Sequence, residues 1–265
     1  MFDAPPVVIA ISASDPTSGA GLQADILTLS SMGCHPLAVV PAITIQDTSG
    51  VKDVYALDPD WVAEQTRCVL EDSKIAAFKI GLLGSAEIIA VVAEMIDDYP
   101  NIPVVLDPVL VSGRGDELAS AEMISAMIDL LIPKTTLLTP NSLEARRLSG
   151  ESDLDRCAGR LLRMGCEYVL ITGAHENTPE VVNTLYSREG EVRNDRWARL
   201  AGSFHGSGCT LAGACAAALA NGMSVPEAVK YAQDFTWRAL KHAFRLGAGQ
   251  AIPDRLFWTI EEDDA

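Results

Sequence analysis

The chain alternates short apolar runs with longer stretches in which apolar residues recur at helical spacing. The short β-branched runs predict strands at residues 7–11, 38–43, 75–79, 104–106, 136–138 and 168–171. The longer stretches predict helices, including residues 22–31, 61–70 and 86–96. Apolar strands separated by amphipathic helices are typical of a mostly parallel sheet covered on both faces. We therefore predict an α/β fold whose ligands bind beyond the carboxyl ends of the strands.

The composition fits a single domain spanning residues 1–265. A chain of 265 residues that is 48% hydrophobic and 21% charged can bury a large core. The longest apolar stretches, such as residues 211–220, fall short of the roughly 20 residues that span a bilayer, and no basic segment leads into an apolar run at the start. The six cysteines form no CxxC pair. We expect a soluble, cytoplasmic protein with reduced thiols and no membrane partner.

The charge balance limits the ligands that the chain can bind. It has 36 acidic and 20 basic side chains and a net charge of −16. Such a charge repels a phosphodiester backbone, so we expect no nucleic-acid partner. The same charge opposes binding of a nucleoside triphosphate. A phosphate site must therefore be local, built from backbone N–H groups, a helix N-terminus and a divalent cation.

A glycine-rich turn late in the chain meets that requirement. It consists of Gly206, Ser207, Gly208, Cys209 and Thr210, and it leads into the alanine-rich run 211–220, a predicted helix. Glycines allow the backbone close to an anion, toward which the first N–H groups of the helix point. Cys209 would lie where the helix dipole lowers a thiol pKa, suited to act as a base. The alternative is an ordinary glycine-rich loop with a cysteine that packs as a small hydrophobic residue.

Two predicted strands lead into carboxylates. Asp107 follows residues 104–106, and residues 136–138 are followed by Asn141 and Glu144. Magnesium takes hard oxygen ligands and bridges phosphates with only one or two carboxylates plus water, so Asp107 and Glu144 are candidate metal residues. The alternative is helix capping. Asn141 is a good N-cap residue, and Glu144 has the spacing of a capping box.

The loop after the first predicted strand contains GAGLQA, which matches the dinucleotide fingerprint GxGxxA. That fingerprint needs its first glycine at the strand end, whereas about seven residues intervene here, so a dehydrogenase is disfavoured. The loop is better suited to close over a small substrate. Asp25 would then be a buried acceptor for an amine or hydroxyl, or alternatively a solvated helix position.

Six blocks in order carry a family resemblance, and they read SASDPTSGAGLQAD, PAITIQDTSGV, IGLLGS, VVLDPV, TPNSLEA and FHGSGCT. With them the chain resembles the hydroxymethylpyrimidine and phosphomethylpyrimidine kinases of thiamine biosynthesis, in the ribokinase-like superfamily. The resemblance implies phosphorylation of 4-amino-5-hydroxymethyl-2-methylpyrimidine to its monophosphate and then its diphosphate with Mg-ATP. It also implies a central, mostly parallel sheet flanked by helices, and a homodimer.

The resemblance also implies roles for individual residues. The pyrimidine pocket would consist of Ala13, Asp25, Gln46, Leu83 and Val109. The Gln46 amide both donates and accepts, which suits an aminopyrimidine edge. Asp107 and Glu144 would lie near the metal, and Asn141, Thr172 and Gly208 near the nucleotide. Gly206, Ser207 and Gly208 would form the anion hole, with Cys209 as the base. Arg114 would lie in a flap, either touching phosphate or simply exposed.

The chain departs from the family pattern at two positions. Ala13 stands where the family often has glycine, and Thr172 stands where it often has lysine. A threonine can hydrogen-bond but carries no charge, which leaves more of the phosphate stabilisation to magnesium and the anion hole. Two alternatives therefore stay open. One is a pyridoxal or pyridoxine kinase of the same superfamily, and the other is a pyrimidine-binding regulator without turnover.

Overall fold

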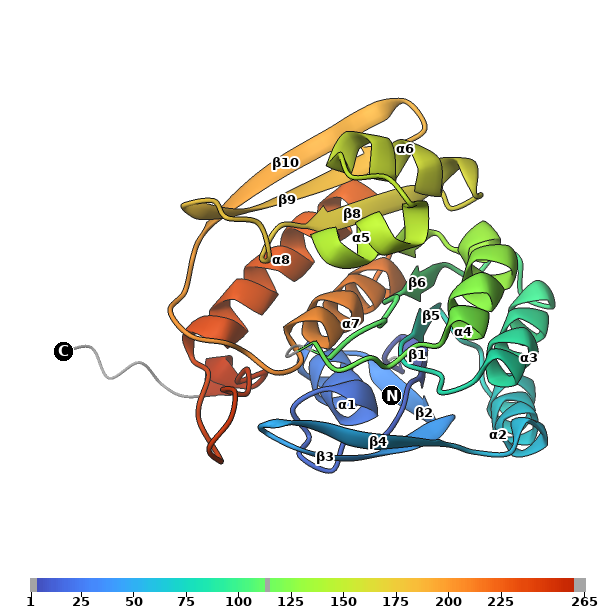
Figure 1. Cartoon of the computed structure of the whole chain (residues 1–265). Helices are drawn as coiled ribbons and strands as arrows, with labels where there is room; N and C mark the ends of the chain where they lie inside the picture. The colour runs from blue at the N-terminus through green and yellow to red at the C-terminus, as the bar shows by residue number, and fades with distance from the viewer. Residues whose placement is uncertain (1–3, 113–114, 260–265) are drawn as a thin grey trace.

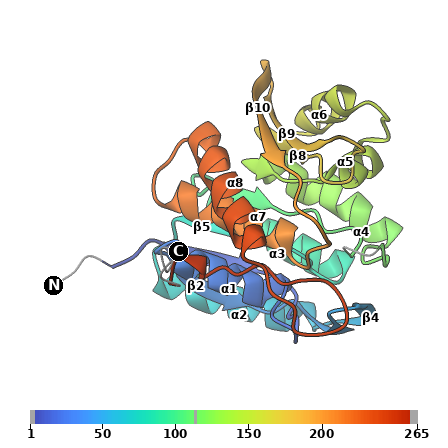
Figure 2. The same ribbon diagram turned by 90° about the vertical axis from the view of Figure 1, so that its left-hand side faces the viewer.

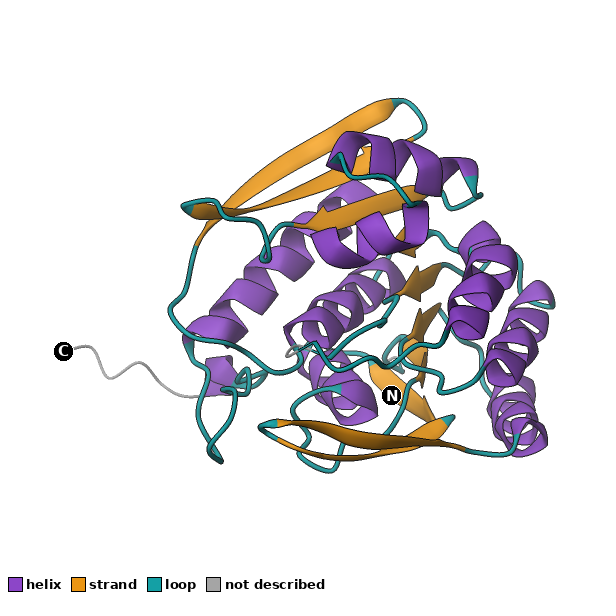
Figure 3. Cartoon of the chain, viewed as in Figure 1, coloured by secondary structure: helices purple, strands orange, loops and turns teal. Residues whose placement is uncertain are grey.

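The computed structural model describes residues 4–112 and 115–259, and within them one large sheet crosses the molecule (Figures 1 and 3). Its strand order is β10-β9-β8-β7-β6-β5-β1-β2. Pairing is parallel from β2 through β8, and β9 and β10 pair antiparallel. The strands are β1 (Val7–Ile11), β2 (His35–Val39), β5 (Ala77–Ile80), β6 (Val104–Leu106), β7 (Leu137–Leu138), β8 (Tyr168–Thr172), β9 (Glu180–Ser187) and β10 (Gly190–Ala198). The prediction of a mostly parallel sheet is confirmed.

Helices cover both faces of this sheet. One face carries α1 (Gly21–Ser31), α7 (Ser207–Ala220) and α8 (Val225–Lys241), and Figure 2 shows α7 and α8 side by side. The other carries α2 (Pro59–Asp72), α3 (Ala86–Asp97), α4 (Ala121–Ala126), α5 (Ser142–Ser149) and α6 (Leu154–Arg163). Side chains of β1 alternate between the two cores, with Ile9 and Ile11 in one and Val8 and Ala10 in the other. This explains why the strands are apolar throughout.

The strand predicted at residues 38–43 is wrong, because two strands of different sheets share that stretch. β2 ends at Val39, and β3 (Ala42–Asp47) pairs with β4 (Gly50–Ala56) in a separate hairpin, at the bottom of Figure 1. Pro41 has no N–H to donate to a sheet, and the N–H of Val40 donates instead to the side chain of Gln65 at 3.2 Å. The chain therefore leaves the main sheet at this point.

The strand order creates a switch point beside β1. After β1 the chain adds β2 on one side, and it later returns to add β5 on the other. In open α/β sheets, ligands bind in the crevice beyond the carboxyl ends of strands at such a point. The loops after β1 and β5 are joined there, because the N–H of Ala13 donates to the carbonyl of Leu82 at 2.8 Å. This edge of the sheet contains the candidate site.

Candidate active site

The strand order separates the predicted nucleotide residues from the predicted substrate residues. Asp107 directly follows β6 in the middle of the edge. Asn141 follows β7 and Thr172 ends β8 on one side of it, and the N–H of Thr172 donates to the carbonyl just before Asn141. Ala13 follows β1 and Leu83 follows β5 on the other side. The two groups of residues therefore flank Asp107.

The first turn of α7 faces Asp107. A Cβ added to Gly208 would lie 3.8 Å from both carboxylate oxygens of Asp107, and Gly208 is exposed. Gly206 has a φ of 81°, and a Cβ there would lie 1.9 Å from the carbonyl oxygen of Gly19. Only glycine fits this close approach of two loops. The helix therefore begins at the edge of the sheet, where its free N–H groups can bind an anion.

The expected thiolate at Cys209 is wrong for the free protein. Burial raises the pKa of the thiol to about 12, and the nearby charge of Lys79 lowers it by less. The carboxylates of Asp107 and Asp25 push the pKa in the same direction as burial. Desolvation and negative neighbours thus outweigh the helix dipole on which the expectation relied. Cys209 is therefore a thiol at neutral pH, and it donates a hydrogen bond to Asp107.

Asp107 and Glu144 form a buried acidic pair. Their exposed fractions are 5% and 6%, and burial raises the pKa of both, with a further increase at Glu144 from the charge of Asp107. The capping alternative for Glu144 is confirmed. Its Oε2 accepts from the N–H of Asn141 at 2.9 Å, while Asn141 caps α5 in return. Glu144 Oε1 also accepts from the N–H of Leu110 at 3.3 Å.

Lys79 was not among the predicted site residues. It lies on β5 with its ammonium 2.9 Å from the carboxylate of Asp25, and both side chains are fully buried. Burial lowers the pKa of Lys79, but the neighbouring carboxylates of Asp25 and Asp107 outweigh that effect and raise it. Lys79 is therefore a permanent cation beside two carboxylates and the neutral thiol of Cys209. Asp25 is paired with this cation, and the alternative of a solvated helix position is wrong because Asp25 is fully buried.

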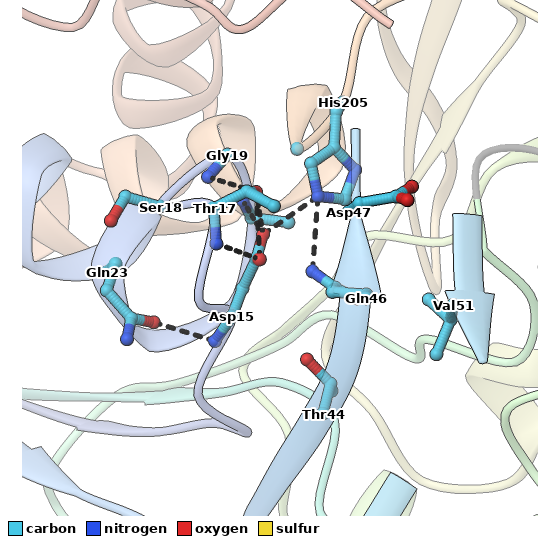
Figure 4. A network of polar contacts seen from close by, with 12 residues as sticks. Asp15, Thr17, Ser18, Gly19, Gln23, Thr44, Gln46, Asp47, Val51 and His205 are labelled. Atoms are coloured by element: carbon cyan, nitrogen blue, oxygen red, sulfur yellow. Dashed lines mark hydrogen bonds and ion pairs between the residues drawn. The ribbon is translucent and has the colours of Figure 1, made fainter. Parts of the chain in front are cut away.

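Gln46 lies on β3 beside two residues that were also not predicted, as Figure 4 shows. Its Nε2 is 3.3 Å from Nε2 of His205, which in turn lies 2.8 Å from Oδ2 of Asp15. Asp15 has only 2% of its surface exposed. Burial opposes its ionisation, but hydrogen bonds from His205, Gln46 and backbone N–H groups outweigh burial and lower its pKa.

The remaining predicted residues differ in their access to solvent. Ala13 and Leu83 are buried, with 2% exposed in each case, whereas Val109 and Gln46 are half-buried. Asn141 and Thr172 are also half-buried. Arg114 lies outside the described residues. The pocket predicted for the pyrimidine therefore combines a buried apolar part with an accessible amide.

The residues that were missed had weak but readable signals. Lys79 interrupts an otherwise apolar strand, and a charge in such a strand needs a buried partner. Asp15 and His205 lie inside the blocks SASDPTSGAGLQAD and FHGSGCT, in which glycines give the strongest local signal. Arg255 had no signal in its surroundings, yet it is 2% exposed and donates to Thr210 of α7 and to the carbonyl of Gly19.

A mostly parallel sheet covered by helices on both faces, with a helix N-terminus beside the acidic end of β6, is the architecture of the ribokinase-like class. The solved structure of Bacillus subtilis pyridoxal kinase in complex with ADP has the same fold, with a TM-score of 0.89 and 28% identity over 97% of this chain and 99% of that one. The chain belongs to the phosphomethylpyrimidine kinase family, whose model matches residues 15–254.

Curated relatives agree with this assignment. A hydroxymethylpyrimidine/phosphomethylpyrimidine kinase of Streptomyces coelicolor is 38% identical over 264 residues, which cover 97% of each chain. The thiamine biosynthetic bifunctional enzyme TH1 of Arabidopsis thaliana is 34% identical over 269 residues. That match covers 97% of this chain and 51% of the plant enzyme, so the chain corresponds to about half of it.

Proposed function

We propose that the chain phosphorylates 4-amino-5-hydroxymethyl-2-methylpyrimidine with ATP, first to the monophosphate and then to the diphosphate, as a step of thiamine biosynthesis. The observation that carries the proposal is the arrangement around Asp107. The residues predicted to bind the nucleotide flank it on the side of β7 and β8, those predicted to bind the substrate flank it on the side of β1 and β5, and the first turn of α7 faces it. The family and the relatives named above support the same activity.

Gly206, Ser207, Gly208 and Cys209 would form the anion hole for the transferred phosphoryl group. Backbone N–H groups at a helix start bring partial positive charge without a side chain that must be desolvated. Phosphoryl transfer has a loose transition state, so positioning and electrostatic stabilisation do most of the work. Cys209 would accept the proton of the substrate hydroxyl. Its own proton would first leave to solvent, a loss that a cation held by Asp107 would favour by neutralising one of the charges that raise the pKa of the thiol.

Asp107 and Glu144 would hold Mg²⁺, directly or through water. Oδ2 of Asp107 is buried and has no hydrogen-bond partner among the described residues, and the charge of Asp107 raises the pKa of Glu144, which favours a cation beside the two carboxylates. The described residues contain no cluster of three or more acidic, histidine or cysteine ligands, which suits a metal that binds few protein groups. When bound, Mg²⁺ would neutralise charge on the phosphates.

Asn141 and Thr172 would bind the nucleotide. Both are half-buried on the β7 and β8 side, where their polar groups can hydrogen-bond to phosphate oxygens but bring no charge. In a chain with a net charge of −16, the cation and the helix N-terminus would then carry the electrostatic part of ATP binding. The ADP complex of the B. subtilis enzyme supports a nucleotide as ligand.

Ala13, Asp25, Gln46, Leu83 and Val109 would form the pyrimidine pocket. Ala13 and Leu83 would provide an apolar wall, and Val109 would contact the ring at its accessible side. Gln46 would bind the polar edge of the ring. Asp25 would act indirectly by holding Lys79 in place, because its carboxylate is fully buried in the ion pair.

We further propose that the chain works as one cytoplasmic domain that forms a homodimer through the β3–β4 hairpin. Ile43, Ile45 and Tyr55 share one face of this hairpin and are 46%, 57% and 68% exposed. Three large apolar side chains together on a two-stranded edge are typical of a contact between proteins.

The described residues include no helix that is long and apolar enough to cross a membrane.

The proposed activity is tested with purified protein, Mg-ATP and the aminopyrimidine, followed by mass spectrometry of the products. The expected result is a monophosphate that appears first and a diphosphate that follows, with two ATP consumed for each diphosphate formed. Binding of the pyrimidine in a calorimeter without any ATP consumption would instead support the regulator. Neither binding nor turnover would exclude both functions.

A pyridoxal kinase is the second candidate. The observation in its favour is the close structural similarity to B. subtilis pyridoxal kinase, with a TM-score of 0.89. Both activities need the same anion hole and metal residues. The residues around Gln46 and Leu83, which would contact the substrate, therefore decide which of the two substrates is used. A competition between the two substrates distinguishes them.

A further inference from the structure

Arg255 is a buried arginine that contacts the start of α7. It precedes the short helix Phe257–Thr259 and has 2% of its surface exposed. Its Nε donates to Oγ1 of Thr210 at 3.0 Å. Its Nη2 donates to the carbonyl of Gly19 at 2.6 Å, and its Nη1 donates to the carbonyl of Ser18 at 3.4 Å. One guanidinium group therefore joins the C-terminal segment to α7 and to the loop after β1.

These contacts close a ring around Gly206, the residue before α7. The hydroxyl of Thr210 accepts from Arg255 and donates to the carbonyl of Gly206 at 2.8 Å. The carbonyl oxygen of Gly19, which accepts from the same guanidinium, would lie 1.9 Å from a Cβ added to Gly206. Thr210 is fully buried, whereas Gly208 is exposed. Arg255 therefore contacts the turn from its buried side and leaves the exposed side open to a ligand.

The loop after β1 is strained where Arg255 binds it. Among the non-glycine residues of the described ranges, only Ser18 has a positive φ, of 58°. A left-handed backbone is unfavourable for a residue with a Cβ, so the surrounding contacts must impose it. The N–H of Ser18 donates to the carbonyl of Asp15 at 3.0 Å, and the carbonyl of Ser18 accepts from Arg255. Figure 4 shows this loop. Arg255 thus helps to hold a strained segment against the turn before α7.

Arg255 is a buried cation without a carboxylate of its own. Its hydrogen-bond partners among the described residues are one hydroxyl and two carbonyls, all of them neutral. Burial lowers its pKa, and nearby acidic groups, including Asp25 and Asp15, raise it through their charge alone. Those two carboxylates are already paired with Lys79 and His205. A guanidinium stays charged even when buried, and a buried charge is unfavourable until a counter-ion is near.

Resting on the function proposed above, we propose that Arg255 is a positioning residue that fixes the anion hole at the start of α7 and places a buried positive charge beside it. The counter-ion of this charge is the phosphoryl group in transfer. The first N–H groups of α7 and the guanidinium then act on the same anion, the first by hydrogen bonds and the second by its charge. Thr172 brings no charge on the nucleotide side of the site, and Arg255 offsets that lack from the other side of the turn.

The test measures kcat for phosphorylation of the aminopyrimidine and the Kd for this compound in the wild type, in Arg255→Gln and in the control Arg193→Gln. Arg193 is a half-buried arginine on β10 that pairs with Asp195 and donates to the carbonyl of Pro226. In Arg255→Gln, kcat should fall by at least about tenfold. The Kd should change by less than about twofold, because the pyrimidine itself is uncharged. The control should keep both values.

A further variant, Arg255→Lys, separates the charge from general damage to the site. Lysine keeps the positive charge and one hydrogen bond, so its kcat should stay within about threefold of the wild type. An equal kcat in Arg255→Lys and Arg255→Gln would overturn the proposal, because the loss would then not come from the charge. An unchanged kcat in Arg255→Gln, or a loss of pyrimidine affinity as large as the loss in kcat, would also overturn it.

If the variants of Arg255 do not fold, Thr210→Val provides a second test. It keeps the shape of the side chain but removes the hydroxyl that joins Arg255 to the carbonyl of Gly206. We expect kcat to fall by about tenfold at an unchanged Kd for the pyrimidine, because a small displacement of the turn is enough to misalign the transfer. A kcat equal to that of the wild type would overturn the proposal.

Calorimetry with the non-hydrolysable ATP analogue AMP-PCP and Mg²⁺ gives a result that does not depend on turnover. Arg255→Gln should bind the analogue at least about fivefold more weakly than the wild type and Arg255→Lys do. Equal affinity in the wild type and Arg255→Gln would overturn the proposal. Failure of the proposed function looks different, because then the wild type would phosphorylate no pyrimidine while the difference in AMP-PCP binding would remain.

Discussion

The ammonium of Lys79 lies 2.9 Å from the carboxylate of Asp25, and neither side chain has any exposed surface. The pair joins β5 to α1 directly beneath the edge that contains Asp107 and Cys209. A buried ion pair adds little net stability, but each charge becomes costly without the other. Lys79 also keeps a positive charge close to the carboxylates of Asp25 and Asp107 in a chain whose net charge is −16. The pair therefore contributes to the electrostatics of the site as well as to the fold.

Removing one partner of this pair should destabilise the protein strongly. Lys79→Met leaves the Asp25 carboxylate buried and unpaired, and we expect the free energy of unfolding to fall by about 3–5 kcal/mol. Urea unfolding followed by circular dichroism measures the change. In the double variant Asp25→Asn/Lys79→Met no charge remains, so it should recover most of the loss.

The pair of Lys134, which is half-buried, and Asp97, which is exposed, is the control, and Lys134→Met should have a much smaller effect. A double variant that lost as much stability as the two single changes added together would contradict the interpretation of Lys79 and Asp25 as a coupled pair.

Cys209→Ala should reduce turnover much more than it reduces binding. A group that takes up the substrate proton acts in the chemical step, so kcat should fall about a hundredfold or more while the Kd for the pyrimidine changes little. Steady-state kinetics and calorimetry separate the two effects. Cys215→Ala removes a buried thiol from the same helix and should keep kcat near the wild-type value. An unchanged kcat in Cys209→Ala would remove Cys209 from the mechanism.

Glu144 should make the stability of the metal-free protein depend on pH. Burial and the charge of Asp107 raise its pKa from 4.5 to about 8 in the folded protein. Between these values the folded state binds a proton that the unfolded state does not, so stability falls as the pH rises from 4.5 to 8. Thermal melting from pH 5 to 9 should show a smaller decline in Glu144→Gln. Glu94→Gln, an exposed position on α3, should decline like the wild type, and equal slopes in all three proteins would refute the prediction.

Gly206→Ala tests the contact between the turn before α7 and the loop after β1. Both Gly206 and Gly222 have positive φ angles, of 81° and 85°, so alanine is strained at either position by about 1–2 kcal/mol. Only at Gly206 would the new Cβ collide with the backbone at Gly19, whereas Gly222 has no atom within 4 Å of it. Gly206→Ala should therefore lose activity, and Gly222→Ala should keep it with a modest drop in Tm. Equal effects on activity would contradict the close approach.

Local patterns were sufficient to predict the elements that pack simply. The strands at residues 7–11 and 104–106 and the helices of the core match the structure closely, because their side chains face a continuous apolar core. The strand predicted at residues 38–43 was wrong because an apolar run does not reveal which sheet each half of it joins. The chain leaves the main sheet here because of Pro41 and because the N–H of Val40 donates to the side chain of Gln65, 25 positions away.

The chemistry of the site was less predictable than its location. The positions of Asp107 and of the turn before α7 follow from strand ends and glycines, which are local signals. The pKa of the Cys209 thiol is raised and not lowered as expected, because it depends on burial and on carboxylates from α1 and from the loop after β6. The roles of Lys79 and His205 could not be predicted for the same reason, because their partners Asp25 and Asp15 are 54 and 190 positions away. Contacts between distant segments of the chain cannot be read from one segment.

The most direct test of the account is a competition for limiting Mg-ATP between the aminopyrimidine and pyridoxal at equal concentrations, with products identified by mass spectrometry. The arrangement around Asp107, together with the Gln46 amide as the group that binds the polar edge of the ring, predicts that phosphorylated pyrimidine is the main product. The monophosphate should appear first and the diphosphate later. Pyridoxal phosphate as the main product, or no phosphorylated pyrimidine at all, would contradict the account.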